Sequence, residues 1–220
     1  MDIFLDRWLP IIWKAMIETF QMTGISLFFS ILIGIPLGIL LVITRPGQAL
    51  ENKWLYQLFN LIINIVRSIP FIILLFFMLP FTKAIVGTTI GVRGVIVPLV
   101  VYAAPYISRL IESALVEVDG GIIEAYTAMG IKRYQIIWHV MLREARPAIT
   151  LGLTIATVSL IGATAMAGLV GAGGLGDLAY RFGFQRFEVD VMYATVIILI
   201  ILVQGTQSIG NRVAARLKKD

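Results

Sequence analysis

Long uncharged apolar stretches alternate with short polar segments along most of the chain. A helix that crosses the hydrocarbon core of a membrane needs about 20 apolar residues. Stretches of about this length recur five times, and each ends at a cluster of charged or turn-forming residues. The pattern predicts an all-α polytopic membrane protein of about five transmembrane helices, over residues 20–43, 55–79, 88–107, 148–170 and 191–209.

Composition supports a membrane environment. The 220 residues are 59% hydrophobic and 14% charged, with a mean hydropathy of +0.92. Soluble domains contain about 25% charged residues. A soluble fold of this length could not bury so much apolar surface, so we expect residues 1–220 to form a single membrane domain. The absence of cysteine excludes disulfides and thiolate metal sites.

The first 19 residues do not resemble a cleaved signal peptide, which places basic residues before its apolar core. Here two acidic residues precede Arg7, and Trp8 and Trp13 interrupt a short apolar run. Tryptophan is enriched at the level of the lipid headgroups. The segment is therefore expected to be an interfacial helix, and the first span to be an uncleaved targeting signal.

Basic residues are unevenly distributed between the two sides that these spans define. Six lie on the side of the N-terminus and eleven on the other side. Because cytoplasmic segments are enriched in lysine and arginine, the N-terminus is expected outside and the C-terminus inside. This bias explains the net charge of +5 without a nucleic-acid partner. The eleven are Arg45, Lys53, Arg109, Lys132, Arg133, Arg143, Arg146, Arg212, Arg216, Lys218 and Lys219.

The longest cytoplasmic segment, residues 110–146, has the pattern of two short helices separated by a glycine. Gly120 and Gly121 mark a break, and Gly130 can end the first helix in a left-handed cap. His139, the only histidine, falls on the polar side of the second helix. The element is either a surface helix on its own spans or a docking element for a cytoplasmic partner. The apolar face of the second helix is predicted to contain Ile131, Tyr134, Ile137, Trp138, Met141 and Leu142.

Glu124 and Ala125, followed by Gly130, resemble the EAA loop of the permease subunits of bacterial ABC importers. The stretches "ITRPGQ", "NIVRSIPFIILL", "PFTKAIVGTTIG", "EAYTAMG" and "VGAGGLG" extend the resemblance, from residue 43 to 176, to the permeases of methionine importers. One departure is Arg143 after Leu142, where the family usually has proline. The resemblance assigns ATPase coupling to Glu124, Ala125, Ala128, Met129 and Gly130.

The resemblance implies an assembly in the bacterial cytoplasmic membrane. It implies two copies of this chain, two ATP-binding subunits that fit the coupling loop, and an extracytoplasmic methionine-binding lipoprotein. Transport of D- or L-methionine would proceed by alternating access. The chain has no G-x-x-x-x-G-K-[ST] motif and no H-E-x-x-H motif, so it is expected to be non-catalytic, without metal or cofactor, with ATP and Mg²⁺ held by the partner ATPase.

Arg67 is a candidate pathway or gate residue within the second predicted span. A charge at that depth costs roughly 2.5–3.5 kcal/mol, so it should face the bundle interior or a wet cavity. Alternatively, Pro70 kinks the helix and leaves Arg67 near the cytoplasmic interface. Either way, "RSIP" is expected to change the helix geometry.

The fourth predicted span, 148–170, is rich in small residues. Such residues favour close helix packing. They also permit a narrow pathway, for which Thr157, Thr164 and Met166 are the candidates, with Met166 as an adaptable gate.

The glycines after the fourth span match the spacing of a dinucleotide-binding fingerprint. That fingerprint requires a strand before the turn, and here a 23-residue apolar helix precedes it. The segment is also expected outside the cytoplasm. We therefore interpret it as a tight turn that shapes the outer mouth of the pathway beneath a docked binding protein, through Gly171, Gly173, Gly174 and Gly176.

Other transporters fit the pattern less well. A permease for a phosphonate, a polar amino acid or a quaternary amine would share the same features. An ion-coupled secondary transporter predicts inverted repeats or acidic residues within spans. The five predicted spans contain no Asp or Glu. Five helices are also too few to enclose a pathway comfortably, which favours a two-fold dimer.

Overall fold

The computed structural model describes residues 2–48 and 50–218, so Lys219 of the basic tail lies outside the described residues. This part of the chain consists of helices joined by short turns and contains no strand, which confirms the all-α prediction. The helices are α1 (Asp2–Thr44), α2 (Lys53–Ser68), α3 (Phe71–Val86), α4 (Gly91–Val116), α5 (Gly120–Ala128), α6 (Arg133–Gln135), α7 (Leu142–Glu144), α8 (Arg146–Ala167), α9 (Gly174–Leu178) and α10 (Val189–Leu217). Two π-helical segments, η1 (Ile136–Met141) and η3 (Ala179–Phe184), and a 3₁₀ turn, η2 (Gly168–Val170), complete the chain order.

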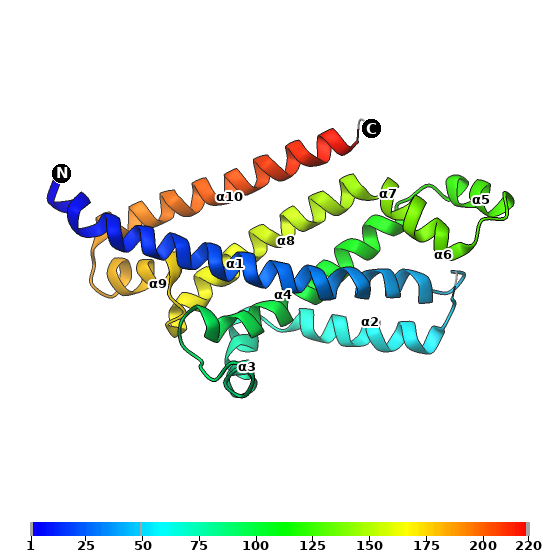
Figure 1. The fold of residues 1–220 in the computed structure, drawn as a ribbon. Helices are drawn as coiled ribbons and strands as arrows, with labels where there is room; N and C mark the ends of the chain where they lie inside the picture. The colour runs from blue at the N-terminus through cyan, green and yellow to red at the C-terminus, as the bar shows by residue number, and fades with distance from the viewer. Residues whose placement is uncertain (1, 49, 219–220) are drawn as a thin grey trace.

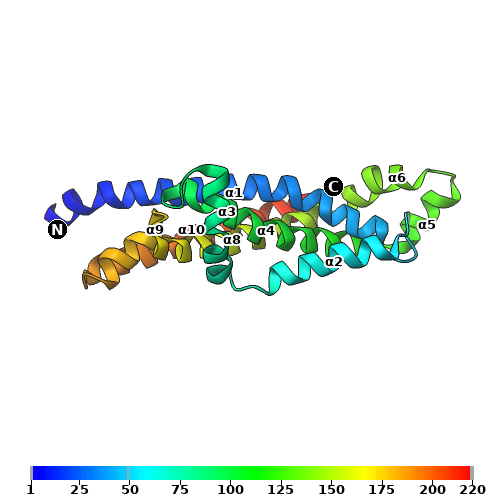
Figure 2. The ribbon, with the colours of Figure 1, turned by 90° about the horizontal axis from the view of Figure 1, so that it is seen from below.

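Among the described residues, four continuous helices are long and apolar enough to cross a membrane, and the bent pair α2–α3 is a candidate fifth span. The predicted spans fall within these elements, except that the third, 88–107, begins three residues before α4. The protomer is elongated, with the N-terminus at one end and α5 and α6 at the other (Figures 1 and 2). The C-terminus lies toward the end that carries α5, α6 and α7 (Figure 1). The two termini therefore lie toward opposite ends, as an odd number of crossings requires.

The N-terminal segment does not form a separate helix. α1 runs without a break from Asp2 to Thr44. Trp8 is only 4% exposed and packs with Ile12 against Leu175 and Val191, whereas Trp13 is 61% exposed. The helix continues because its first turns are covered by α9 and α10, and burial of this apolar face stabilises the helix against other protein rather than lipid.

α1 and α4 pack closely over much of their length. A Cβ atom on Gly34 would lie 2.9 Å from the carbonyl oxygen of Ala104, and one on Gly38 would lie 2.7 Å from that of Ser108. The two glycines thus bring the backbones together, as their G-x-x-x-G spacing predicts. The same stripe of small buried side chains continues toward the N-terminus through Ser30, Ser26, Thr23 and Thr19.

The second predicted span is two helices rather than one. The axes of α2 and α3 differ by 107°. Pro70 has no N–H to donate and disfavours helical geometry in the residue before it. Ile69 accordingly has extended backbone angles of −83° and 122°. The expected change of geometry at "RSIP" is confirmed, with Arg67 in the last turn of α2.

The third predicted span, 88–107, ends too early, because α4 continues to Val116. Arg109 does not end the helix, since its guanidinium is held by polar side chains of α2 and by Glu112 one turn away. The cytoplasmic segment therefore begins after Val116 rather than at residue 110. The fifth span also extends on both sides, over Val189–Leu217.

Candidate functional site

The cytoplasmic segment begins with α5, whose start is fixed by a side-chain cap. The carboxylate of Asp119 accepts a hydrogen bond from the N–H of Gly121 over 2.8 Å. This interaction satisfies one of the amide groups that the first turn of a helix leaves unpaired. The glycine pair thus marks the break between α4 and α5, as the sequence predicts.

Gly130 ends α5 in a Schellman motif. It has a φ of +77°, which favours glycine. The N–H of Gly130 donates to the carbonyl of Thr127 over 3.0 Å, and the N–H of Ile131 donates to that of Tyr126 over 3.2 Å. These are the two bonds that define the motif. The predicted left-handed cap is confirmed, and it fixes the turn between the two helices.

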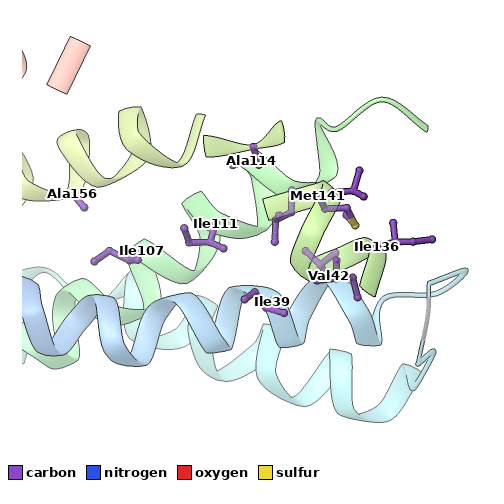
Figure 3. Close-up of a cluster of buried hydrophobic side chains, with 12 residues drawn as sticks. Ile39, Val42, Ile107, Ile111, Ala114, Ile136, Met141 and Ala156 are labelled. Carbon is purple, nitrogen blue, oxygen red and sulfur yellow. The ribbon is translucent and has the colours of Figure 1, made fainter. Parts of the chain in front are cut away.

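The second helix of the segment comprises α6, η1 and α7. Its centre is π-helical, and Ile136, Ile137, Val140 and Met141 are buried there. Figure 3 shows Ile136 and Met141 near Val42 of α1 and Ala114 of α4, in the same hydrophobic cluster.

The predicted apolar face of this helix is partly wrong. Tyr134 and Trp138 are 59% and 61% exposed, and Ile136 and Val140 are buried in their place. A π-helix contains more residues per turn than an α-helix. It therefore rotates Trp138, within η1, away from the face that a 3.6-residue period predicts, whereas Tyr134 precedes η1 and is exposed in α6. His139 is exposed, on the polar side as expected.

α5 itself has no buried residue. Glu124, Ala125, Ala128 and Met129 are all exposed, and Met129 is 65% exposed. A hollow of about 270 Å³ separates α5 and η1 from the end of α1. The four residues and Gly130 thus lie on the exposed side of α5 and its C-terminal turn, at an end of the molecule, and the other side of α5 packs through Ile122, Ile123 and Tyr126.

The three α8 candidates do not share one surface. Met166 is 50% exposed, on the same face as Ile155 and Leu151. Thr164 is buried and donates its hydroxyl to the carbonyl of Ile161. Thr157 instead faces a groove between α8 and α10. Of the three, Met166 is the side chain on the open face of the protomer.

Arg67 lies beside α4. It is exposed, and its guanidinium carbon is 5.8 Å from the ring centre of Tyr106, a cation–π distance. One turn away on α4, the hydroxyl of Tyr102 is 2.9 Å from that of Ser159 on α8. Arg67, Tyr106, Tyr102 and Ser159 therefore form a polar row across α2, α4 and α8.

A polar cluster that the sequence reading missed joins α2 to α4. Arg109 donates to Glu112 over 2.5 Å, to Asn64 over 3.0 Å and also to Asn60. Tyr56 donates to the other oxygen of Glu112 over 3.4 Å. Asn60 and Asn64 are four residues apart, a spacing that places both amides on one helix face. This spacing was the only sequence signal for the cluster.

Glu112 also changes an inference from the sequence. It is only 7% exposed and lies within a helix long enough to span the membrane, as does Glu18 in α1. The expectation that the spans contain no acidic residue depended on predicted ends that were too short. Both carboxylates are engaged by neighbouring groups, Glu112 by Arg109 and Glu18 by Lys14 and a backbone amide.

The outer loop follows a helix rather than a strand, so it is no dinucleotide fingerprint. Gly171, Gly173 and Gly174 have φ values of +78°, +83° and +79°. A Cβ on Gly176 would lie 2.2 Å from the carbonyl oxygen of Ala165. Glycine is therefore required at these positions by backbone geometry and close packing.

Two side chains of α1 cap this loop. Glu18 accepts a hydrogen bond from the N–H of Gly174 over 2.7 Å, and the hydroxyl of Thr19 accepts one from the N–H of Leu175 over 2.9 Å. Beside them lies a hollow of about 660 Å³, bordered also by Asp177 and Arg181. The caps are 156 residues from the loop along the chain, so no local pattern could have revealed them.

Comparison with known proteins adds to this geometry. Residues 30–219 match the family described as the binding-protein-dependent transport system inner membrane component. The probable D-methionine transport system permease protein MetI of Vibrio cholerae is 46% identical over 91% of this chain and 89% of its own length. MetI of Escherichia coli K12 is 49% identical over 72% of this chain and 75% of its own length.

A solved structure of the inward-facing MetNI methionine ABC transporter contains a chain with the same fold. The TM-score is 0.92 and the identity 45%, over 99% of both chains. The family match covers far more than half of the sequence, and the Vibrio cholerae relative and the solved MetNI chain match over 89–99% of both chains. This chain belongs to the family of binding-protein-dependent transport system inner membrane components.

Proposed function

We propose that this chain is the permease of an ABC importer that moves methionine across the inner membrane. Two copies would form the pathway, with two ATP-binding subunits on the cytoplasmic side and a methionine-binding lipoprotein outside. Near full-length similarity to proteins named as methionine permeases supports the substrate. A permease for another small solute would share the fold, so substrate identity is the point to test.

The exposure of α5 is the observation that supports coupling to a separate ATPase. α5 has no fully buried residue, and it packs against its own chain through the partly buried Ile122, Ile123 and Tyr126. Glu124, Ala125, Ala128 and Met129 are free for contact with a partner. ATP and Mg²⁺ would be held entirely by that partner, since this sequence contains no phosphate-binding glycine loop.

The pathway would run along the open faces of α4 and α8 in a dimer. The row from Arg67 to Ser159 offers polar groups, and Met166 on the same side of α8 as Ser159 offers a flexible apolar gate. Thr157 and Thr164 are not included in this proposal, because their hydroxyls are already bonded to backbone carbonyls.

In this proposal, alternating access is driven through α5, which is joined to α1 and α4 by the second helix of the cytoplasmic segment. Closure of the ATPase pair would move α5, and the second helix would transmit the movement to α1 and α4 through the cluster of Val42, Ile111 and Met141. The protomers would then open outward to accept methionine, and hydrolysis would return them inward. A packed cluster transmits movement well because it resists deformation.

The substrate is tested by reconstituting the chain with its ATPase and binding protein in vesicles. We expect ATP-dependent uptake of labelled L-methionine, reduced by excess unlabelled methionine and unaffected by a phosphonate or a quaternary amine. D-Methionine as competitor reports stereoselectivity. Uptake of another solute without uptake of methionine would contradict the substrate and leave the family unchanged.

The coupling role of α5 is tested with Gly130→Val. A β-branched residue at φ +77° costs roughly 1–3 kcal/mol, so uptake should fall by about tenfold or more. Gly87→Val is the matched control, with a φ of +80° and equally open surroundings at the end of α3. Equal uptake by the two variants would contradict the role of α5.

A further inference from the structure

The cytoplasmic ends of α8 and α10 enclose a basic pocket that the transport cycle does not use. Its volume is about 230 Å³. Its lining carries three cationic side chains and one carboxylate. The lining residues are Arg143, Glu144, Arg146, Pro147, Leu217 and Lys218.

The three cations of this pocket are available to an external anion. Arg143, Arg146 and Lys218 are all exposed, and none of them forms an ion pair within the described part of the chain. Glu144 also forms no ion pair there. The pocket thus carries an excess of positive charge, and its charge fits an anionic group.

A separate groove between α8 and α10 begins about one turn further along α8, from Pro147 of the pocket to Thr150 of the groove. Its volume is about 310 Å³, and Leu153 and Gly210 line it together with four threonines. Gly210 and Thr154 are in close contact across the two helices, because a Cβ on this glycine would lie 2.0 Å from the threonine hydroxyl. The groove and the pocket lie on one side of this helix pair.

The groove suits an apolar occupant despite its threonines. Each hydroxyl donates to a carbonyl of its own helix over 2.7–2.8 Å. No hydroxyl proton is left for a ligand, so the threonines offer it mainly their methyl groups. The four are Thr150, Thr154, Thr157 and Thr206.

The distance from the pocket to the far end of the groove matches the hydrocarbon thickness of one membrane leaflet. The 11 residues from Arg146 to Thr157 span about 16 Å at ~1.5 Å per residue. Half of the hydrocarbon core of a bilayer is about 15 Å thick. An acyl chain that starts at the basic pocket would therefore end near Thr157, close to the middle of the membrane.

We propose that this pocket and groove form a binding site for an anionic phospholipid of the cytoplasmic leaflet. Arg146 and Lys218 bind the phosphate, with Arg143 at the rim, and one acyl chain lies along the outer side of the α8–α10 groove, over the contact of Thr154 with Gly210. Basic pockets between transmembrane helices on the cytoplasmic side favour such headgroups. The site is separate from α5 and from the open face of α8.

The test compares lipid retention between variants of the assembled transporter. The complex is placed in nanodiscs of mixed phosphatidylglycerol and phosphatidylcholine, released into detergent, and its retained lipids are measured by mass spectrometry. We expect enrichment of phosphatidylglycerol that falls about tenfold in the Arg146→Gln/Lys218→Gln variant. Arg45→Gln/Lys53→Gln, which removes two exposed cations from the same end, should retain the enrichment.

Two further variants probe the acyl chain. Thr206→Phe leaves the charges unchanged but fills the groove, and it should also lower retention. Val213→Cys introduces a single thiol into a chain without cysteine, one turn from Gly210. A fluorophore there should be quenched more by brominated phosphatidylglycerol than by brominated phosphatidylcholine.

Equal retention in wild type and Arg146→Gln/Lys218→Gln would overturn the proposal, as would equal quenching by the two brominated lipids. Cross-linking of Val213→Cys to a second copy or to the ATPase, without retained lipid, would assign the groove to a protein partner instead. None of these measurements uses methionine, so their outcome is independent of the substrate assignment.

Discussion

The Cβ atom that Gly38 lacks would lie 2.7 Å from the Cβ of Ile111, closer than real side chains approach. Any side chain larger than hydrogen at this position would therefore force α1 and α4 apart. Gly24, on the same helix, has no atom within 4 Å of the equivalent position. Two glycines of one helix thus differ completely in what they contribute to packing.

Gly38→Ala should lower stability by roughly 1–3 kcal/mol, because the added methyl group forces α1 away from α4. Gly24→Ala should be neutral or stabilising by up to about 1 kcal/mol, since alanine favours helix. The measurement is the midpoint of thermal unfolding in detergent, followed by size-exclusion chromatography. Equal midpoints for the two variants would contradict the close contact.

At this scale, sequence patterns identify residues whose partners are near in the chain. The spacing of Gly34 and Gly38 and the cap at Gly130 were both predicted, because each follows from local geometry. Glu18 was not predicted to cap the outer loop. Its partner, Gly174, lies 156 residues away, and only the folded structure brings the two together.

Among the elements, α2 has one exposed apolar face and one polar face that bonds to another helix. Its exposed apolar face includes Leu58 and Ile62, whereas Asn60 and Asn64 bond to Arg109 of α4. The cluster therefore attaches α2 to the last turns of α4. It also explains why α4 extends beyond the predicted end of its span.

The attachment predicts a non-additive pair of variants. Arg109→Met leaves the carboxylate of Glu112 without its cation and should lower stability by roughly 2–3 kcal/mol. Arg109→Met/Glu112→Met removes both charges and should recover much of that loss. Thermal unfolding of the single and double variants measures this difference. A double variant less stable than Arg109→Met would contradict the ion-pair account.

The sequence predicted which elements exist better than where they end. Three of the five spans were placed within continuous helices, but the second is broken at Pro70 and the third, 88–107, is shifted relative to α4, which runs from Gly91 to Val116. Charged residues were taken as helix ends, although Arg109 and Glu112 neutralise each other inside a helix. The second cytoplasmic helix was misread for a different reason, because η1 departs from the α-helical period.

For the whole molecule, the positions of the termini and of α5 agree with the orientation inferred from basic residues. The segment after α1, the segment from α5 to α7 and the C-terminal part of α10 all lie toward one end (Figure 1). The outer loop and the N-terminus lie toward the other end (Figure 1). A chain without cysteine allows this orientation to be tested with single thiols.

Phe187→Cys, at a side chain that is 82% exposed near the start of α10, should react with a membrane-impermeant maleimide in intact spheroplasts. Thr127→Cys, on exposed α5, should react only after the membrane is permeabilised. Mass spectrometry of the purified chain measures both. The reverse pattern would place α5 outside and contradict its coupling role.

The cap of the outer loop has a consequence for how the chain is made. Glu18 and Thr19 leave the ribosome long before Gly174 and Leu175, their partners in the finished protein. At a synthesis rate of about 5–20 residues per second, the delay is roughly 8–30 s. During that interval the N-terminal half of α1 lacks its partners from α9 and α10. Closure of the outer end is therefore a late event in biogenesis, and a chain truncated before Gly174 would leave Glu18 without that partner in the membrane.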